Sequence, residues 1–280
     1  AAVNATGGTF VAYLFAHNNS DGEFGPDGDA DIIKCGSYTG NGSYTTGNIV
    51  NVGFEPQFLM IKNASTGSTN WIIYDTMRGY TATNEAQPGL FPNLSNAETS
   101  SGGSAYQSLI TSSGFKLMDS NEAVNKSGDN YIYMAIRRGP LAAPTDATKV
   151  FAMDSGSSSS PAFTAGFPVD MAFKRHRTAT DNWRTTARLI QGSNHFTNTT
   201  GADEVTASQM FDYQNGYYDD SQSSANQAWM WKRAPGYFDV VAYSGNSTAG
   251  RTVSHNLGVA PEMIWVKVRN LSSGWVVLHT

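Results

Sequence analysis

The sequence is poor in the residues that disulfide bonding, nucleic-acid binding and membrane insertion need. Its one cysteine, Cys35, excludes a disulfide within the chain, so packing alone must hold the core. Charged residues make up 15% of the 280 residues and the formal net charge is −5. Nucleic-acid binding needs a basic face, and the one basic run, 174–177, is typical of a solvated strand end. No apolar run approaches the ~20 residues of a membrane helix. We therefore expect neither nucleic-acid binding nor membrane insertion.

Catalytic motifs are also missing. The histidines stand in no His-Glu-x-x-His pattern, and the single cysteine excludes Cys-x-x-Cys; there is no Gly-x-Ser-x-Gly turn and no phosphate-binding glycine loop. We therefore expect a protein that is not an enzyme. Carboxylate pairs of the glycosidase kind meet only in three dimensions, so an enzyme that cleaves polysaccharide stays an alternative.

What the sequence does have is an internal repeat. Gly53, Pro56 and Lys62 recur 205 residues later, as Gly258, Pro261 and Lys267. Tryptophan follows each copy, at Trp71 and Trp275, and a weaker third copy covers 166–174 and leads to Trp183. Self-similarity at a fixed spacing indicates repeated structural units.

Each copy has the pattern of a β-hairpin. Glycine and proline form a turn, and the short apolar run behind them is rich in branched and aromatic residues, which favours a buried strand. A second apolar run begins at the tryptophan, after a gap of hairpin-loop length. No capped helical run is evident. The sequence therefore predicts an all-β protein of tandem β-sandwich modules.

The repeats also predict the domain boundaries. We expect a complete sandwich over 32–138, a linker over 139–147, a degenerate sandwich over 148–233 and the start of a further, incomplete module over 236–280. Residues 2–15 align with 123–136, which close the first sandwich. Residues 1–17 are thus predicted to be the last strand of a preceding module, in an array truncated at both ends.

A linker over 18–31 is rich in aspartate and glycine and contains a candidate metal site. Asp27, Asp29 and Asp31 stand at every second position, and Asp21 lies nearby. Carboxylates spaced in this way in a turn can converge on Ca²⁺, which takes six to eight oxygen ligands. The sequence predicts a calcium site here, although it lacks a complete EF-hand. An acidic solvated linker is the alternative.

A polar-aromatic loop over 212–220 is the candidate ligand site. It has no counterpart in the other repeats, and it sets Tyr213, Tyr217 and Tyr218 among aspartate and asparagine. Such loops offer flat faces and hydrogen bonds to sugars, so we predict glycan binding by these tyrosines. A well-packed surface loop is the alternative. The repeated tryptophans are expected in the core or at an interface.

Several of the repeated motifs resemble one known family. These motifs are Tyr38-Thr39-Gly40-Asn41-Gly42, Tyr131-Ile132-Tyr133-Met134-Ala135-Ile136-Arg137-Arg138-Gly139-Pro140 and Val253-Ser254-His255-Asn256-Leu257-Gly258. They are similar to the tandem modules of large virion proteins of marine tailed phages. The resemblance implies jelly-roll or concanavalin-like sandwiches in a fibre-like appendage, and it transfers no catalytic residue.

The resemblance also implies a function. The expected protein is a non-enzymatic structural repeat of a tail fibre or capsid fibre that contributes to attachment to host-surface glycan. It is expected in the virion, assembled in the host cytoplasm, and associated with itself, as a homotrimer or filament, and with other virion proteins. The alternatives are a polysaccharide depolymerase tailspike and a secreted adhesin or filament-forming surface protein.

Overall fold

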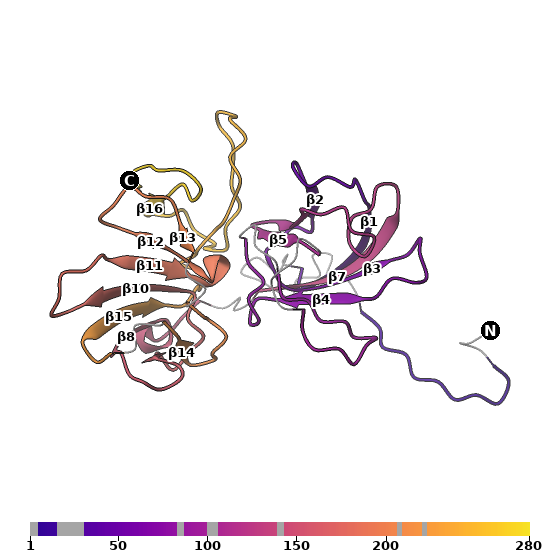
Figure 1. Cartoon of the computed structure of the whole chain (residues 1–280), viewed down its shortest axis with the longest axis horizontal. Coiled ribbons are helices and arrows are strands. Elements are labelled where there is room, and N and C mark those ends of the chain that lie inside the picture. Colours follow the sequence, from indigo (N-terminus) through magenta and orange to yellow (C-terminus); the bar gives the residue numbers. More distant parts are fainter. Residues whose placement is uncertain are drawn as a thin grey trace.

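The computed structural model of the protein describes residues 5–15, 31–82, 87–99, 106–138, 143–205, 209–219 and 223–280. In these ranges the regular secondary structure is almost entirely β-strand, arranged as two β-sandwich modules and a C-terminal hairpin (Figure 1). The predicted all-β tandem fold is therefore confirmed. Two short 3-10 helices, η1 (Ala147–Lys149) and η2 (Arg188–Ile190), are also described. In this part of the chain no helix has the length and apolar character to cross a membrane.

The first module consists of two antiparallel sheets. A four-stranded sheet in the order β1-β7-β3-β4 faces a three-stranded sheet in the order β2-β6-β5. Their strands are β1 (Ile33–Thr39), β2 (Asn48–Asn51), β3 (Pro56–Asn63), β4 (Ile72–Asp75), β5 (Ser108–Thr111), β6 (Gly114–Leu117) and β7 (Asn130–Arg137). The short polar strands β2 and β5 were not predicted, because asparagine and serine at these positions are more typical of loops.

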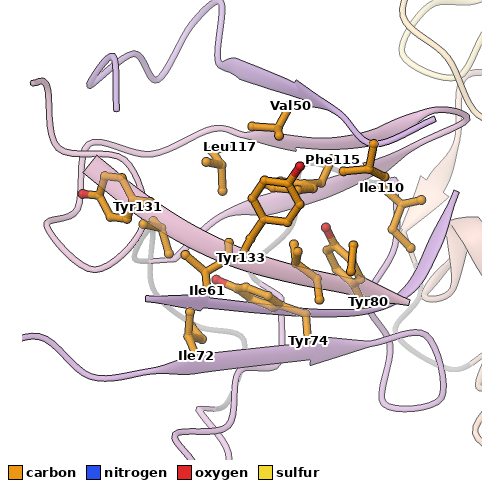
Figure 2. Close-up of a cluster of buried hydrophobic side chains, with 14 of the residues drawn as sticks. Val50, Ile61, Ile72, Tyr74, Tyr80, Ile110, Phe115, Leu117, Tyr131 and Tyr133 are labelled. Carbon is orange, nitrogen blue, oxygen red and sulfur yellow. The ribbon is translucent and has the colours of Figure 1, made fainter. Parts of the chain in front are cut away.

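The core of this module lies between the two sheets (Figure 2). Alternate residues of each strand face it, as the period of two requires: Leu59 and Ile61 in β3 and Phe115 and Leu117 in β6 are fully buried. Full burial of one such side chain stabilises the fold by about 1.5–3 kcal/mol. The core thus replaces the disulfides that the chain cannot form.

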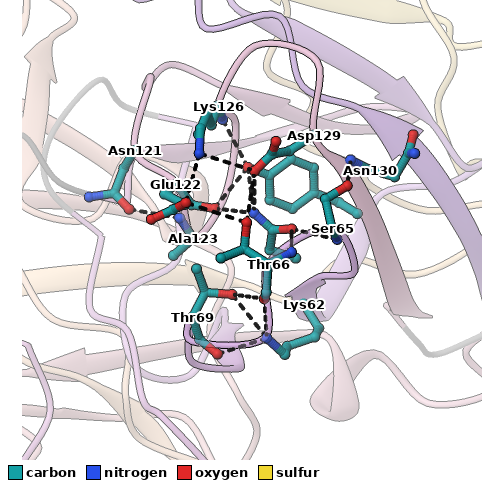
Figure 3. A network of polar contacts seen from close by, with 12 residues as sticks. Lys62, Ser65, Thr66, Thr69, Asn121, Glu122, Ala123, Lys126, Asp129 and Asn130 are labelled. Atoms are coloured by element: carbon teal, nitrogen blue, oxygen red, sulfur yellow. Dashed lines mark hydrogen bonds and ion pairs between the residues drawn. The ribbon is translucent and has the colours of Figure 1, made fainter.

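A polar network holds the turn before β7 against the loop of the β3–β4 hairpin (Figure 3). The side-chain amide of Asn63 donates to the carbonyl of Glu122 (2.7 Å) and to the Asp129 carboxylate (2.8 Å). The backbone N–H of Asn130 donates to the Ser65 hydroxyl (2.8 Å). The start of β7 is therefore held by these side-chain contacts as well as by its backbone pairing with β3.

The second module repeats the strand order of the first. In its six-stranded sheet, β13-β12-β11-β10-β15-β8, the run β8-β15-β10-β11 corresponds to β1-β7-β3-β4, and a two-stranded sheet, β14-β9, lies opposite. The strands are β8 (Phe151–Ser155), β9 (Phe163–Thr164), β10 (Met171–His176), β11 (Arg184–Ala187), β12 (Ser193–Phe196), β13 (Glu204–Val205), β14 (Gly216–Tyr217) and β15 (Asn226–Trp231).

Aligning Lys174 of β10 with Lys62 of β3 would misplace β10 by one residue, because Lys174 comes eight residues after its opening glycine and Lys62 comes nine. Counted from the opening glycine, Lys174 occupies the position of Ile61, and like Ile61 it is buried. A one-residue slip moves a side chain to the other face of a sheet. Lys174 therefore points into the module, where the carboxylate of Asp219 pairs with it.

The C-terminal hairpin has the register of the β3–β4 hairpin. In β16 (Met263–Val266) and β17 (Val276–His279), Ile264 pairs with Leu278. The corresponding pair of the first module, at the repeat spacing, is Leu59 with Tyr74. The repeat read from Gly53 and Gly258 is thus present in the backbone pairing of the two hairpins.

Two predicted strands form no strand in the structure. Within predicted segment 1–17, the described residues 5–8 form a turn and residues 9–15 are not paired with a strand, and the segment runs away from the first module (Figure 1). Residues 237–243, expected to open a third module, likewise form no strand, although Phe238 makes an isolated bridge with Ala234. A strand needs a neighbour for its backbone hydrogen bonds, and beyond that one bridge the described residues supply none at either place.

Candidate functional site

Tyr217 does not lie where the glycan prediction requires it. It is fully buried in β14, with its ring stacked on Phe163 (centroids 5.1 Å apart) and on Phe211 (5.3 Å). A ring packed on both faces leaves none for a sugar, so the prediction for Tyr217 is wrong. Tyr213 and Tyr218 are half-buried, and Tyr218 packs against the same core. Glycan binding by these two stays a prediction.

Tyr217 is buried because its part of the 212–220 loop has a counterpart in the first module. Ala165 and Gly166 donate their backbone N–H groups to the carbonyl of Asn215, at 2.7 and 3.1 Å. In the first module Val52 and Gly53 donate in the same way to Ser113, at 2.8 and 3.0 Å. Residues 215–217 therefore match 113–115, and the tyrosine takes the core position of the phenylalanine. The shared glycine-aromatic pair was the signal in the sequence.

The predicted calcium site falls mostly outside the described residues. Asp21, Asp27 and Asp29 lie there, and Asp31 is described, with its carboxylate 3.4 Å from the Lys34 ammonium. In the ranges that the structure describes, no three His, Cys, Asp or Glu side chains are grouped as a metal site would need. Calcium binding stays a prediction.

An aromatic surface on the outer face of the second module is the stronger candidate for ligand contact. We define it as Trp183, Trp229 and Arg175. The two indole rings lie 5.6 Å apart, and the Arg175 guanidinium lies 5.8 Å from the Trp183 ring centroid. Alternation along β15 buries Ala228 and Met230 and so turns Trp229 outward. Trp183 remains 40% exposed, which leaves ring surface for a ligand.

Asparagine side chains fix the repeated tryptophans in both modules. The Asn198 carbonyl accepts from the backbone N–H of Trp183 (3.1 Å), and its amide donates to Asn182 (2.9 Å). In the first module the Asn93 side-chain carbonyl accepts from the backbone N–H of Trp71 (3.0 Å), and its amide donates to the side chain of Asn70 (2.8 Å). These bonds hold the backbone of each tryptophan, where its strand begins.

Beside Trp71 the outer face of the first module has a shallow hollow. Its volume is about 270 Å³, and it is lined by Met60, Trp71, Pro92 and Asn93. Both modules therefore present a tryptophan on the outer face of the sheet. This answers the expectation for the repeated tryptophans: Trp71 and Trp183 are held in the fold by their backbone and keep part of the ring at the surface.

A buried ionic cluster joins the two modules. We call it the junction cluster, and it consists of three arginines and three carboxylates: Arg138, Arg188, Arg233, Glu55, Asp170 and Asp239. The Arg233 guanidinium forms a two-pronged ion pair with Glu55, at 2.7 and 2.8 Å. Asp170 is fully buried and contacts all three arginines. With three groups of each sign, the cluster is formally neutral.

The pairing crosses between the modules in both directions. Arg138 closes the first module and reaches Asp170 of the second, whereas Arg233 closes the second and reaches Glu55 of the first. Apolar contact adds to this, because Leu189 of η2 is buried in the core of the first module. The modules are therefore joined at the junction by buried ionic contacts and by this apolar contact.

The arginines also determine the ionisation of Asp170. Burial raises the pKa of its carboxyl group, but Arg138, Arg233 and Arg188 together outweigh burial and hold the pKa below its ordinary value. Burial likewise opposes the charge of Arg233, yet Glu55 and Asp170 raise its pKa above the usual range. Both shifts favour the charged forms of Asp170 and Arg233.

Residues 1–140 and 143–280 each match the model of a single family. The chain belongs to the family described as domain of unknown function (DUF7483), and it carries two copies. No curated protein and no solved structure matches it. The boundary between the DUF7483 copies falls between the two sandwiches, and the second copy includes the C-terminal hairpin.

In the second DUF7483 copy a histidine–carboxylate pair has a structural role. His195 of β12 faces the Asp203 carboxylate, and Arg269 pairs with the same group at 2.8 Å. Burial raises the pKa of Asp203, but the hydrogen bond from His195 and the charge of Arg269 lower it further than burial raises it. The His195 ring also meets Trp275 edge to face. Through Arg269 and Trp275, the His195–Asp203 pair thus holds the C-terminal hairpin against the second sandwich.

Proposed function

We propose that the chain is a non-enzymatic structural segment of a phage virion appendage, a tail fibre or capsid fibre. In this role the repeated sandwiches form a stiff rod that associates with further copies and with other virion proteins. The rod contributes to attachment to host-surface glycan. The observation that carries the proposal is the junction cluster, which sets the orientation of one module on the next.

The physical argument concerns stiffness. Domains joined through small polar interfaces move relative to one another by default. Here a relative movement would separate Arg233 from Glu55 and leave buried charges unpaired, which costs several kcal/mol per ion. A junction of this kind suits an extended appendage that must transmit contact without folding back. It has no use in a flexible linker between independent domains.

The glycan part of the proposal rests on the aromatic surface. An exposed tryptophan ring offers an apolar face to the C–H side of a sugar, and a neighbouring guanidinium donates hydrogen bonds to hydroxyl or carboxylate groups. Trp183 and Arg175 combine both kinds of group, and Trp71 repeats the aromatic part in the first module. Repeated weak sites along a rod gain strength by multivalency.

The appendage role is tested by locating the protein on particles. Antibodies raised against the chain are expected to label a projecting fibre on virions purified from the host that yields this sequence. Labelling of the cell surface in the absence of particles would favour the adhesin alternative instead.

The depolymerase alternative is tested by turnover. Incubation of the chain with purified host polysaccharide is expected to release no new reducing ends. Release that disappears on substitution of a carboxylate pair would replace the proposed function with an enzymatic one.

A further inference from the structure

Residues 5–8 of the N-terminal segment form a turn of the same kind as the turn at 126–129, which precedes β7. Gly7 and Gly128 both have positive φ, at 80° and 85°. The N–H of Gly8 donates to the Ala5 carbonyl at 3.0 Å, as that of Asp129 donates to Lys126 at 3.2 Å. These positions also correspond in the aligned sequences. Local geometry and sequence therefore agree that residues 5–15 are a copy of the segment that leads into β7.

The strand that should follow this turn has no neighbour. In the first module β7 lies between β1 and β3 and pairs with both. Its inward residue Ala135 is fully buried, whereas the corresponding Leu14 is 91% exposed. Phe10, Val11, Tyr13 and Phe15 are exposed as well. An apolar segment of strand sequence with unpaired backbone groups is a template for pairing with another chain.

The C-terminal hairpin has the complementary vacancy. β3 pairs with β4 on one edge and with β7 on the other, whereas β16 pairs with β17 alone among the described residues. The lack of a neighbour appears in the burial too. Leu59 of β3 is fully buried, but its counterpart Ile264 is 40% exposed. β16 therefore lacks a neighbour equivalent to β7, and residues 5–15 resemble the segment that leads into β7.

The turns give a second, independent sign of the vacancy. In the first module Gly40 lies against the turn before β7, so a Cβ on Gly40 would come within 2.1 Å of the Lys126 carbonyl oxygen. Gly245 is the repeat of Gly40 in the sequence, and nothing lies within 4 Å of a Cβ placed there. The glycine is kept at a position where the structure shows no contact that requires it.

From these observations we propose that residues 9–15 of one copy of this chain add as a strand to the free edge of β16 in a second copy. The turn at 5–8 then docks on the Gly245 turn, as 126–129 docks on Gly40. Backbone hydrogen bonds supply affinity in such strand addition, and alternate side chains supply the register. This interface joins two different surfaces, so it generates head-to-tail assemblies, which are rings where the rotation closes and open chains where it does not. The inference deepens the self-association of the proposed appendage and rests on that function.

The experiment uses one donor variant and one acceptor variant of the whole chain. Leu14→Asp places a charge on the inward face of the donor strand, and Gly245→Val blocks the turn that receives it. Both positions are exposed or open in the single chain, so each variant is expected to keep the thermal unfolding midpoint of the unmodified protein. Mass is measured by light scattering after size-exclusion chromatography over a range of concentrations.

The unmodified protein is expected to grow in mass with concentration, and each variant alone is expected to have the mass of one chain. An equal mixture of the two variants is expected to stop at two chains, because one intact donor meets one intact acceptor. Val11→Asp is the matched control: it places the same charge on the outward face of the donor strand, where the corresponding Ile132 is exposed, and is expected to assemble as the unmodified protein does. Ile264→Asp provides a second acceptor variant, which is expected to behave as Gly245→Val.

Two results would overturn the inference. One is a single-chain mass for the unmodified protein at every concentration. The other is full assembly of the Leu14→Asp variant. A single-chain mass with a lowered unfolding midpoint for Leu14→Asp would show instead that the segment closes on its own chain. None of these results decides the virion role, which particle labelling tests separately.

Discussion

Glu55 and Arg233 stand 178 residues apart in the sequence, yet they form a buried two-pronged ion pair, with both N–O distances below 2.9 Å. Glu55 immediately precedes β3 of the first module, and Arg233 follows β15, the last strand of the second module. Because each charge is removed from water, the pair holds only while the modules keep this orientation. The pair therefore links the stability of each module to the presence of the other.

Removing one partner of the junction cluster is expected to destabilise the whole chain. Asp170→Asn leaves three buried guanidinium groups with two carboxylates, and breaking a buried ion pair in this way costs about 3–5 kcal/mol. Chemical denaturation monitored by tryptophan fluorescence measures the loss. Lys126→Gln is the control, because Lys126 forms an exposed pair with Glu122 (2.7 Å) and is expected to leave the unfolding midpoint unchanged. Equal stability of the Asp170→Asn and unmodified chains would contradict a structural role for the cluster.

The same carboxylate predicts an acid transition at the junction. The folded-state pKa of Asp170 is lowered, so its contribution to stability is fully present above the ordinary aspartate pKa of about 3.9. It is lost as the pH falls through the lowered folded-state value. Thermal unfolding between pH 7 and pH 2 is expected to show a fall in stability confined to the acid end. The Asp170→Asn variant should lose part of that fall, and a pH dependence identical to that of the unmodified chain would exclude Asp170 as the group responsible.

Tyr217→Phe is expected to stabilise the second module. The Tyr217 hydroxyl is buried and has no hydrogen-bond partner among the described residues. A buried hydroxyl without a partner costs about 1–3 kcal/mol, so its removal at constant ring shape should raise the free energy of unfolding by about 1 kcal/mol. Tyr217→Ala, which removes the ring from the core, is expected to lower it by about 3–5 kcal/mol. A loss of stability in Tyr217→Phe would indicate a partner for the hydroxyl.

Trp183→Ala is expected to weaken glycan binding without unfolding the protein. The ring is 40% exposed, and its removal takes away the stacking face of the aromatic surface. We expect at least a tenfold loss of affinity, about 1.4 kcal/mol, on an array of host-surface glycans. Tyr237→Ala is the matched control, since Tyr237 is equally exposed but lies outside this surface. Equal binding by both variants would remove the aromatic surface from the proposed function.

The sequence was sufficient to predict the hairpins but not the way in which the modules meet. Gly53 and Pro56 mark a turn, and the apolar run behind them has the length of a strand, so β3 and its repeat β16 could be predicted from local pattern. The junction cluster could not, because Glu55 and Arg233 lie in segments that meet only after both sandwiches have formed. Glu55 lies inside the repeated motif but does not itself recur, because Ala260 takes its place 205 residues later, and nothing in the sequence marks Arg233 as its partner.

The glycan site shows a different limit. The 212–220 segment was interpreted as an insertion because it is richer in tyrosine and aspartate than any other repeat, and so Tyr217 was expected at the surface. The backbone instead uses Gly216 and Tyr217 as it uses Gly114 and Phe115. Composition had obscured a two-residue correspondence. The recurrence of Trp183 predicts a core or interface residue, yet what the structure repeats is a backbone N–H bonded to an asparagine side chain rather than a buried ring.

The crossed arginines have a consequence for how such chains change length. Arg138 and Arg233 each close a module and find their carboxylate in the neighbouring one. A recombination event that adds or removes a module must therefore carry a closing arginine and a matching acid together, or it leaves like charges facing each other at the new seam. The unit that has to be exchanged intact is then the seam, with its arginine and its acid, rather than the sandwich.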